Sequence, residues 1–295
     1  MRKPNLFIIG SMKSGTTYLS NLLGAHPSIF MCRPKEPTYF VNPDHLRKLW
    51  PHGWEQGYWK SEETYLDLFM AAGSAMFLSE ASVYYSHLPQ ATGVPRRISL
   101  FNPDARMIYV IRDPIERTIS HYWHRVRSHG EYRQLLDAVK TETLYRDVSY
   151  YSMQLRAYFD YFPRDQIKIL TFEELTGNVD RSIKSIFQWL GLDSSRWKIG
   201  SEPANVTPEI VKVPILDGAL HKLRHETLFY RAVADRIPKQ FREIADRALK
   251  KPIDRLQVDI SIAADYLRPL QMEQTHELSK LIGRKFPEWT TLAAL

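Results

Sequence analysis

The chain has 295 residues, of which 44% are hydrophobic and 12% aromatic, and its formal net charge is +7. This length and composition are sufficient for one sizeable core and predict a single large α/β domain. The only cysteine, Cys32, excludes an intrachain disulfide and a cysteine-based zinc or iron–sulfur framework.

No apolar run in the sequence reaches the roughly 18 residues that a membrane-spanning helix needs. The N-terminus leads into a short strand-like run and has no apolar signal-peptide segment. We therefore predict a cytoplasmic protein, or the soluble catalytic domain of an anchored enzyme. The basic charge is compatible with an anionic ligand such as a nucleotide, an acidic glycan or DNA, although charge alone is explained more simply by solubility.

The chain begins with a predicted strand, loop and helix. Leu6–Gly10 is a short apolar run that ends in glycine, and Gly15–Ala25 carries apolar side chains at helical spacing. Pro27 ends this helix, because proline disfavours the α conformation in the residue before it. A connection with two prolines and three charged residues, Arg33–Pro37, follows.

Residues 42–74 are rich in Trp, Tyr, Gly and Pro, and only 62–71 have a helical pattern. We predict an irregular excursion over the core. Its aromatic residues either line a substrate cleft or form a satellite packing cluster, and the second interpretation is at least as well supported. These residues are Trp50, Trp54, Tyr58 and Trp59.

Three further apolar runs have the length and composition of buried strands, and helical stretches lie among them. The strands are Met76–Ser79, Met107–Ile111 and Ile167–Thr171, and the helices include Pro114–His129 and Ser149–Tyr161. Alternating strands and helices predict right-handed βαβ crossovers, and hence a parallel sheet with helices on both faces. Such sheets bind ligands at the carboxyl ends of their strands.

The last third of the chain has a different pattern. From about residue 205, Leu, Ile and Ala lie among Lys, Arg and Glu and predict several helices with no clear strand. We predict a single domain over 1–295, made of a nucleotide-binding α/β core over 1–200 and a mainly helical extension over about 205–295.

The loop Gly10–Thr17 has the pattern of a phosphate cradle. Two glycines follow a strand, and the hydroxyl pair Thr16 and Thr17 opens a helix, so backbone N–H groups and the helix dipole converge on an anion. In an ATP- or GTP-binding loop a lysine follows the second glycine. Here Thr16 occupies that position and the lysine is Lys13, which argues against an ordinary NTPase. A lysine there can reach the oxygen where charge grows in a loose transfer transition state.

A second anion site is predicted at Arg112 and Ser120. Asp113 is a good N-cap and Pro114 suits the first helical position, so Arg112 ends a strand and lies beside the expected ligand crevice. Its guanidinium matches the oxygens of a phosphate, and Ser120 offers a hydroxyl about two turns further along the helix. Together they are predicted to hold a second phosphate.

Both motifs resemble those of sulfotransferases that use 3′-phosphoadenosine 5′-phosphosulfate (PAPS). Lys13–Thr17 resembles the family's 5′-phosphosulfate loop, Arg112 with Ser120 resembles its 3′-phosphate motif, and the resemblance extends to about residue 192. It implies a P-loop-like α/β fold and transfer of a sulfuryl group from PAPS to a hydroxyl or amine without a metal ion. Lys13 would also assist departure of the bisphosphate product. The residues implied at the 5′ end are Lys13, Ser14, Gly15, Thr16 and Thr17.

The segment Pro34–Phe40 resembles the Lys-Glu-x-x-Tyr/Phe-Phe segment of carbohydrate-type and bacterial sulfotransferases, where the glutamate is the catalytic base. The resemblance makes Glu36 the predicted base, and a carboxylate suits this role if it lies within hydrogen-bond reach of the acceptor hydroxyl. In the cytosolic small-molecule branch the base is a histidine. His26, His87 and His121 match no segment of that branch and rank behind Glu36.

Two weaker matches concern the acceptor and the nucleotide. Ser79–Tyr85 resembles the Glu-x-Ser/Thr-Pro-x-Tyr segment near the acceptor, but Ala81 and Val83 stand where glycan-type members often carry lysine and proline. These departures argue against a glycosaminoglycan acceptor. Tyr151 and Gln154 resemble the helix that follows the 3′-phosphate motif, which makes Tyr151 a further nucleotide-binding candidate.

Two other functions stay open. A P-loop kinase or NTPase needs Mg²⁺ held by the loop hydroxyl and by an acidic residue at a strand end, for which Asp113 is the obvious candidate. A non-enzymatic module that binds an anionic polymer is suggested by Arg125, Arg127 and the basic residues of the last third. We favour the sulfotransferase, with no metal and no nucleic-acid partner. Its acceptor is predicted to carry a hydroxyl on a sugar, a phenol, a lipid or a carrier-bound acyl chain.

Overall fold

The computed structural model describes residues 2–197, 210–214, 250–255 and 258–293. Its centre is a five-stranded parallel sheet with the strand order β2-β3-β1-β4-β5. The strands are β1 (Leu6–Gly10), β2 (Ile29–Met31), β3 (Phe77–Ala81), β4 (Arg106–Ile111) and β5 (Ile167–Thr171). The first strand is therefore central, and the predicted parallel α/β architecture is confirmed.

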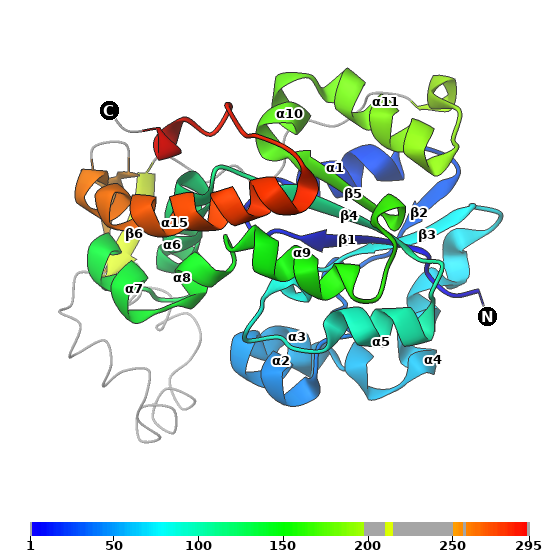
Figure 1. The fold of residues 1–295 in the computed structure, drawn as a ribbon. Coiled ribbons are helices and arrows are strands. Elements are labelled where there is room, and N and C mark those ends of the chain that lie inside the picture. Colours follow the sequence, from blue (N-terminus) through cyan, green and yellow to red (C-terminus); the bar gives the residue numbers. More distant parts are fainter. Residues whose placement is uncertain (1, 198–209, 215–249, 256–257, 294–295) are drawn as a thin grey trace, which may run out of the picture.

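Helices cover both faces of this sheet (Figure 1). On one face lie α1 (Thr16–Gly24), α10 (Phe172–Gly177) and α11 (Val179–Leu190). On the other lie α2 (Pro43–Leu49), α3 (Pro51–Gln56), α4 (Glu62–Leu66), α5 (Val94–Phe101) and α9 (Tyr151–Phe159). The sheet thus separates two apolar cores.

The side chains of β1 alternate between these two cores. Leu6 and Ile8 pack in the core that contains α1 and α11, whereas Phe7 and Ile9 pack in the core that contains α5 and α9. Because successive residues of a strand point to opposite faces, a strand that is buried on both faces is apolar throughout. This double burial explains the uninterrupted apolar run before the phosphate loop.

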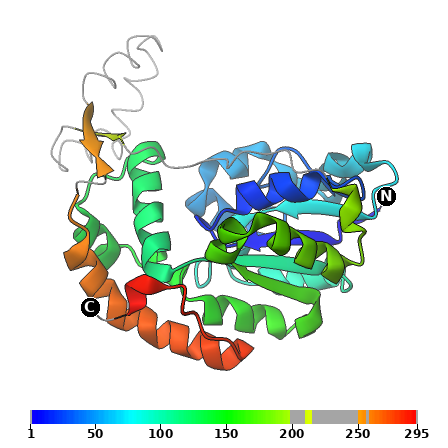
Figure 2. The same cartoon turned by 90° about the horizontal axis from the view of Figure 1, so that it is seen from above.

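A third group of helices lies beyond the carboxyl ends of the strands. It consists of α6 (Pro114–Ser128), α7 (Leu135–Thr141), α8 (Leu144–Asp147) and α15 (Ser261–Ile282). The last of these packs against α6, α7 and α9 (Figure 2). Ala263 and Leu267 of α15 are buried with Ile115 and Trp123 of α6. Within the described ranges, no helix is both long enough and apolar enough to cross a membrane.

The structure corrects two predictions about local structure. Where no strand was predicted, β6 (Ile210–Pro214) and β7 (Lys250–Asp254) form an antiparallel pair. The stretch predicted to be irregular contains α2, α3 and α4, followed by the 3₁₀ helix Asp67–Ala72. Pro43 and Pro51 begin α2 and α3, since proline fits the first turn of a helix. Residues 205–209 and 215–249 of the predicted helical extension lie outside the described residues.

Candidate active site

A pocket of about 710 Å³ opens at the carboxyl ends of β1, β3 and β4. Its size is that of a site for a nucleotide-sized ligand. The charged residues of its wall are Lys13, Lys35, Glu36, Arg112, Glu116, Arg127 and Arg255. Cations outnumber acids in this wall, so the pocket favours an anionic ligand.

The loop between β1 and α1 forms a backbone cradle at the floor of this pocket. Gly10 has φ 144° and Gly15 has φ 81°, which side chains disfavour. A Cβ atom on Gly15 would lie 2.9 Å from the ring of Phe172. None of the described side chains caps the N-terminus of α1. The first N–H groups of this helix are therefore available to an anion in the pocket.

Lys13 lies in this cradle and lines the pocket. Burial, together with the positive charges of Arg127 and Arg112, lowers the pKa of its ammonium group to about 8. A bound anion would favour the charged form and raise the pKa again. The protein thus holds several cations close together where the predicted 5′-phosphosulfate would lie.

Arg112 and Ser120 face the same pocket as Lys13. Because β1 and β4 are parallel neighbours, with Gly10 opposite Tyr109, the loops that follow them meet. This pairing brings together two motifs that lie about a hundred positions apart in the sequence.

The Arg112 side chain is held in place by three contacts. It donates to the carbonyl oxygen of Lys13 at 3.5 Å and to Glu116 Oε2 at 2.6 Å, and it lies 4.6 Å from the centre of the Phe172 ring. Its Nε is buried and has no hydrogen-bond partner in the described part of the chain. A planar cation with a spare donor in a basic pocket is suited to bind a phosphate.

Asp113 has a structural role. Its carboxylate accepts hydrogen bonds from the N–H groups of Ile115 at 3.0 Å, Glu116 at 3.2 Å and Thr291 at 3.1 Å. The predicted N-cap is confirmed, and the residue also ties α6 to the C-terminal segment. An acid that already accepts these bonds is poorly suited to hold Mg²⁺, as the kinase alternative requires.

Glu36 enters the pocket from the loop that follows β2. Its Oε2 accepts a hydrogen bond from the N–H of Val83 at 2.7 Å, and its Oε1 contacts the Lys35 ammonium group. Its own N–H donates to the Ala81 carbonyl oxygen at 3.1 Å. The carboxylate therefore shares one pocket with Lys13.

Two residues assigned to the nucleotide do not line the pocket. The Ser14 hydroxyl is buried 2.7 Å from Ser11 Oγ. The Tyr151 hydroxyl is also buried, and it donates to the carbonyl oxygen of Arg112 at 2.7 Å. Both side chains support the loops that form the pocket, and Tyr151 fixes the strand end that carries Arg112.

None of the three histidines weighed from the sequence lines the pocket. His26 lies with its Nε2 3.0 Å from the Asp193 carbonyl oxygen, and His87 and His121 are buried. A histidine that the sequence analysis did not select, His124, does line it. Burial lowers the pKa of His124 to about 4, with the charge of Lys13 adding to the effect, so its imidazole is neutral at neutral pH.

Helical periodicity is the signal that identifies His124. Together with Arg127 it lies four and seven positions after Ser120, on one face of α6, and all three line the pocket. Two further pocket residues that the sequence analysis did not select, Lys35 and Tyr84, stand within the motif segments Pro34–Phe40 and Ser79–Tyr85. No local pattern marks His129 and Arg255, which also line the pocket.

The tryptophans of residues 42–74 divide between the two predicted roles, lining a substrate cleft and packing on the core. Trp50 lines the pocket and stacks on Tyr84, with ring centres 5.4 Å apart. Trp54 and Trp59 stack on each other at 5.6 Å and pack against the core instead. Only the first of these tryptophans can contact a ligand in the pocket.

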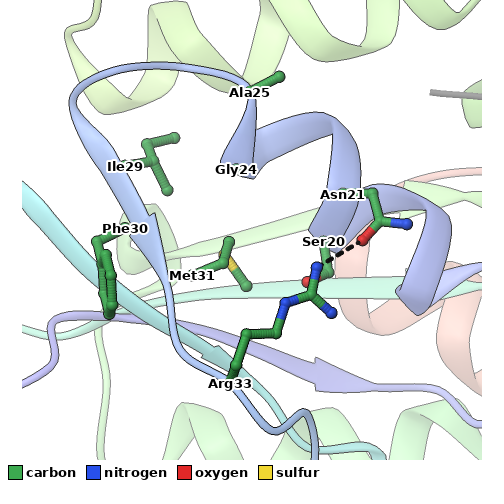
Figure 3. A pocket seen from close by; sticks show the side chains of 8 residues that line it. All are labelled: Ser20, Asn21, Gly24, Ala25, Ile29, Phe30, Met31 and Arg33. Atoms are coloured by element: carbon green, nitrogen blue, oxygen red, sulfur yellow. Dashed lines mark hydrogen bonds between the residues drawn. The ribbon is translucent and has the colours of Figure 1, made fainter. Parts of the chain in front are cut away.

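A second hollow of about 530 Å³ lies between α1 and β2 (Figure 3). Its lining includes the apolar residues Ala25, Ile29, Phe30 and Met31. Its one charged side chain, Arg33, donates to Asn21 Oδ1 at 3.2 Å. The residues predicted to act in catalysis lie in the larger pocket.

Sequence comparison matches residues 4–196 to the model of the sulfotransferase family. A human bifunctional heparan sulfate N-deacetylase/N-sulfotransferase 2 is 29% identical over 213 residues, which is 65% of this chain and 22% of that protein. The membrane-associated sulfotransferase kil1 of Dictyostelium discoideum is 34% identical over 119 residues, which is 40% of this chain and 22% of that protein. The chain thus spans about a fifth of the length of these relatives.

The fold also resembles a solved structure. A crystal structure of a sulfotransferase from Alicyclobacillus acidocaldarius superposes with a TM-score of 0.68 over 98% of this chain and 100% of that chain, at 22% sequence identity. This similarity concerns the fold. Because the family match spans well over half of the sequence and contains both the phosphate loop and Arg112, the chain belongs to the sulfotransferase family.

Proposed function

We propose that this protein transfers the sulfuryl group of PAPS to a hydroxyl or amine of an acceptor. The observation that carries the proposal is the convergence of Lys13, Arg112 and Glu36 on one pocket. The first two suit the two phosphate-bearing ends of PAPS, and the third suits the removal of a proton. A single-phosphate ligand would leave one of the two cationic positions unused.

The donor is proposed to bind through the loop and α6. The N–H groups at the start of α1 and the Lys13 ammonium group hold the 5′-phosphosulfate, and Arg112 with Ser120 holds the 3′-phosphate. During in-line displacement, negative charge grows on the oxygen between phosphorus and sulfur. Lys13 stabilises that charge and so assists departure of adenosine 3′,5′-bisphosphate (PAP).

Glu36 is the proposed base. As the new bond to sulfur forms, the acceptor hydroxyl or amine loses a proton, and a carboxylate in the same pocket can accept it. Its hydrogen bond from Val83 leaves Glu36 further lone pairs for this proton. Neutral His124 is the competing base, because its Nδ1 is buried without a partner in the described part of the chain.

The acceptor is proposed to lie near Glu36 and Tyr84. The names of the heparan sulfate relatives suggest an amine or hydroxyl of an acidic glycan, and the basic wall is compatible with it. Ala81 and Val83 argue against it, and a phenol, a lipid or a carrier-bound acyl chain stays open. A metal-independent reaction and a cytoplasmic location also stay predictions.

Binding of PAP provides the direct test. Isothermal titration in buffer with EDTA should show binding to the wild type, and Arg112→Ala should weaken it about a hundredfold because a charged hydrogen-bonding partner is lost. Arg156→Ala is the matched control, since Arg156 is half exposed on α9 and pairs with Glu277. Failure of the wild type to bind PAP would overturn the proposal, and Mg²⁺-dependent ATP turnover would favour the kinase.

The acceptor class can then be assigned with ³⁵S-labelled PAPS. N-desulfated heparan sulfate presents an amine, fully desulfated N-acetylated heparan sulfate presents hydroxyls, and 2-naphthol presents a phenol. Labelled product from one of these identifies the class. Retention of DNA or heparin without affinity for PAP would instead support the anion-binding module.

A further inference from the structure

Glu80 is a buried carboxylate that the proposed reaction leaves without a role. It precedes the last residue of β3 and is 1% exposed. It accepts hydrogen bonds from the hydroxyls of Tyr65 at 2.6 Å, Tyr85 at 2.9 Å and Ser82 at 3.0 Å. Burying a carboxylate is costly, and neutral hydroxyls offset only part of that cost. Such an arrangement calls for a reason beyond packing.

Two of these hydroxyls also hold the loop that carries Glu36. Ser82 Oγ accepts a hydrogen bond from the N–H of Thr38 at 3.2 Å, and the Tyr85 hydroxyl accepts one from the N–H of Phe40 at 3.4 Å. Each hydroxyl therefore donates its one proton to Glu80 and accepts one from the loop. This direction requires an ionised Glu80, which acts only as an acceptor.

The third hydroxyl belongs to a ring that packs on the same loop. The Tyr65 ring stacks on Tyr39, with centres 4.3 Å apart and an angle of 5°, and meets Phe40 edge-on at 5.6 Å. All three donors to Glu80 thus contact residues 38–40.

The loop needs such attachments because its backbone is unusual. Glu36 has φ 65° and Thr38 has φ 54°, in a region that residues with side chains rarely occupy. On the strand side, Ala81 and Val83 bond the Glu36 backbone and carboxylate. The position of the Glu36 carboxylate therefore depends on the hydrogen bonds that join residues 36–40 to residues 81–85.

We propose that Glu80 is a positioning residue: through the hydroxyls of Ser82 and Tyr85, its ionised carboxylate fixes residues 38–40 and thereby holds Glu36 in the pocket. This inference rests on the proposed role of Glu36 as the base. Glu80 itself does not contact the pocket and acts only through the loop.

The charge state of Glu80 then controls the loop. Desolvation raises the pKa of Glu80 to about 7, with the negative charge of Glu36 adding to the effect and the three hydroxyl donors opposing it. Once protonated, its carboxyl group needs an acceptor of its own, so at least one hydroxyl must turn away and the attachment weakens. The attachment is thus complete well above pH 7, half lost at about pH 7 and lost as the pH falls further.

Few other groups face this carboxylate. They are Cys32 after β2, Glu36 on the loop, Tyr65 on α4, Tyr85 after β3 and Tyr158 on α9. Arg97 on α5 donates through its Nε to the Phe40 carbonyl oxygen at 2.6 Å. Burial keeps Tyr65 and Tyr85 neutral, since the pKa of each is raised well above its usual value. Burial likewise raises the pKa of Cys32 and of Tyr158, so among these buried groups it is Glu80 whose pKa lies near neutral pH.

The test combines hydrogen exchange with kinetics on the full chain. Amide protection of the peptide 36–41, corrected for intrinsic pH dependence, should fall in the wild type between pH 8 and pH 6. In Glu80→Gln it should be low and independent of pH, because an amide cannot ionise. Tyr85→Phe and Ser82→Ala should lower protection at pH 8, whereas Tyr158→Phe, which removes a bond to the Tyr85 carbonyl oxygen, should not.

The kinetic arm uses PAPS with N-desulfated heparan sulfate or 2-naphthol, whichever is turned over. Tyr85→Phe and Glu80→Gln should lower kcat about ten- to a hundredfold while PAP affinity stays within about twofold, since a misplaced base slows the reaction without affecting donor binding. If Glu80→Gln kept the amide protection of the wild type at each pH and the same fall of kcat at low pH, this inference would be overturned and the proposed function would stand. Failure of the wild type to bind PAP would overturn the proposed function instead, whereas full activity of Glu36→Gln would overturn the role of Glu36 as the base, on which the inference rests.

Discussion

Lys13 lies in a basic environment that disfavours its charged form, yet its proposed role in catalysis requires that charge. It is a cation in a basic environment, with a pKa near 8, and it is the residue proposed to meet the growing charge on the leaving group. Removing it should therefore affect the rate of transfer more than donor affinity, because the interaction strengthens only as the reaction proceeds.

The pKa of Lys13 leads to a calorimetric prediction. With a pKa of about 8, the lysine of the free protein is mostly neutral at pH 8.5, and a bound bisphosphate restores its charge, so binding should take up roughly three-quarters of a proton. Titrations in buffers of different ionisation enthalpy measure this number from the slope of the observed enthalpy. The uptake should vanish in Lys13→Met, and PAP affinity of the wild type should weaken above pH 8. A zero slope in the wild type would contradict the prediction.

Residue identity in the site was predictable where a local pattern carries the chemistry. Lys13, Arg112, Ser120 and Glu36 belong to short motifs, and the structure brings all four to one pocket. Tyr151 was assigned to the ligand on the same basis, yet its hydroxyl faces the backbone of Arg112. A motif indicates that a side chain matters to a site, but it does not say whether that side chain faces the ligand or supports its neighbours.

At the scale of elements, α6 links the two parts of the site. Its N-cap, Asp113, follows the proposed phosphate ligand Arg112, and its middle and last turns carry Ser120 and Arg127 along the pocket. The N-cap therefore sets the position of several ligand-facing residues at once.

Replacement of Asp113 should show this dependence. Asp113→Ala removes the acceptor of Ile115, Glu116 and Thr291, and we expect it to lower the free energy of unfolding by about 2 kcal/mol, at the upper end for a helix cap. Asp113→Asn keeps the capping oxygen and should cost less. Urea unfolding followed by circular dichroism measures both. Equal stability of the two variants would mean that the cap contributes little.

Helices and strands could be predicted from the spacing of apolar residues where the element is long enough and its buried faces are clearly defined. The central strand is buried on both faces and α6 on one, so each shows the expected pattern. In contrast, β2 has only three residues, α2 has seven and α3 has six, and α3 contains Pro, Gly and Trp. Tertiary contacts decide the structure of such short segments, and the sequence alone does not record them.

At the scale of the whole molecule, residues beyond the family match complete the site. Trp289 is 2% exposed and stacks on Phe286 at 4.0 Å, and its indole N–H donates to Glu173 at 3.2 Å. Glu173 in turn accepts from the N–H of Asp113 at 3.0 Å. The C-terminal segment thus supports the strand end that carries the proposed phosphate ligand Arg112.

Truncation of this tryptophan should therefore affect both stability and binding. Trp289→Ala is expected to lower the free energy of unfolding by about 3–5 kcal/mol, as is usual for a buried aromatic residue. It should also weaken PAP binding at temperatures where the protein stays folded. Trp189→Ala is the control for loss of an indole and should leave PAP binding unchanged, because the Trp189 side chain donates to the Asp165 carbonyl oxygen at 2.7 Å and does not line the pocket. Unaltered affinity in Trp289→Ala would show that the C-terminal segment does not support the site.

The single thiol of the sequence, Cys32, can report local opening of the protein. Cys32 is 4% exposed, its N–H donates to the Ser79 carbonyl oxygen at 2.9 Å, and burial together with Glu80 raises its pKa, so in the closed protein it is shielded and protonated. A thiol reagent can modify it only when the chain around it opens. Because the sequence has no second cysteine to react with the reagent, the rate of thiol modification of the wild-type protein reports the opening of the segment that joins β2 to the Glu36 loop and separates it from β3.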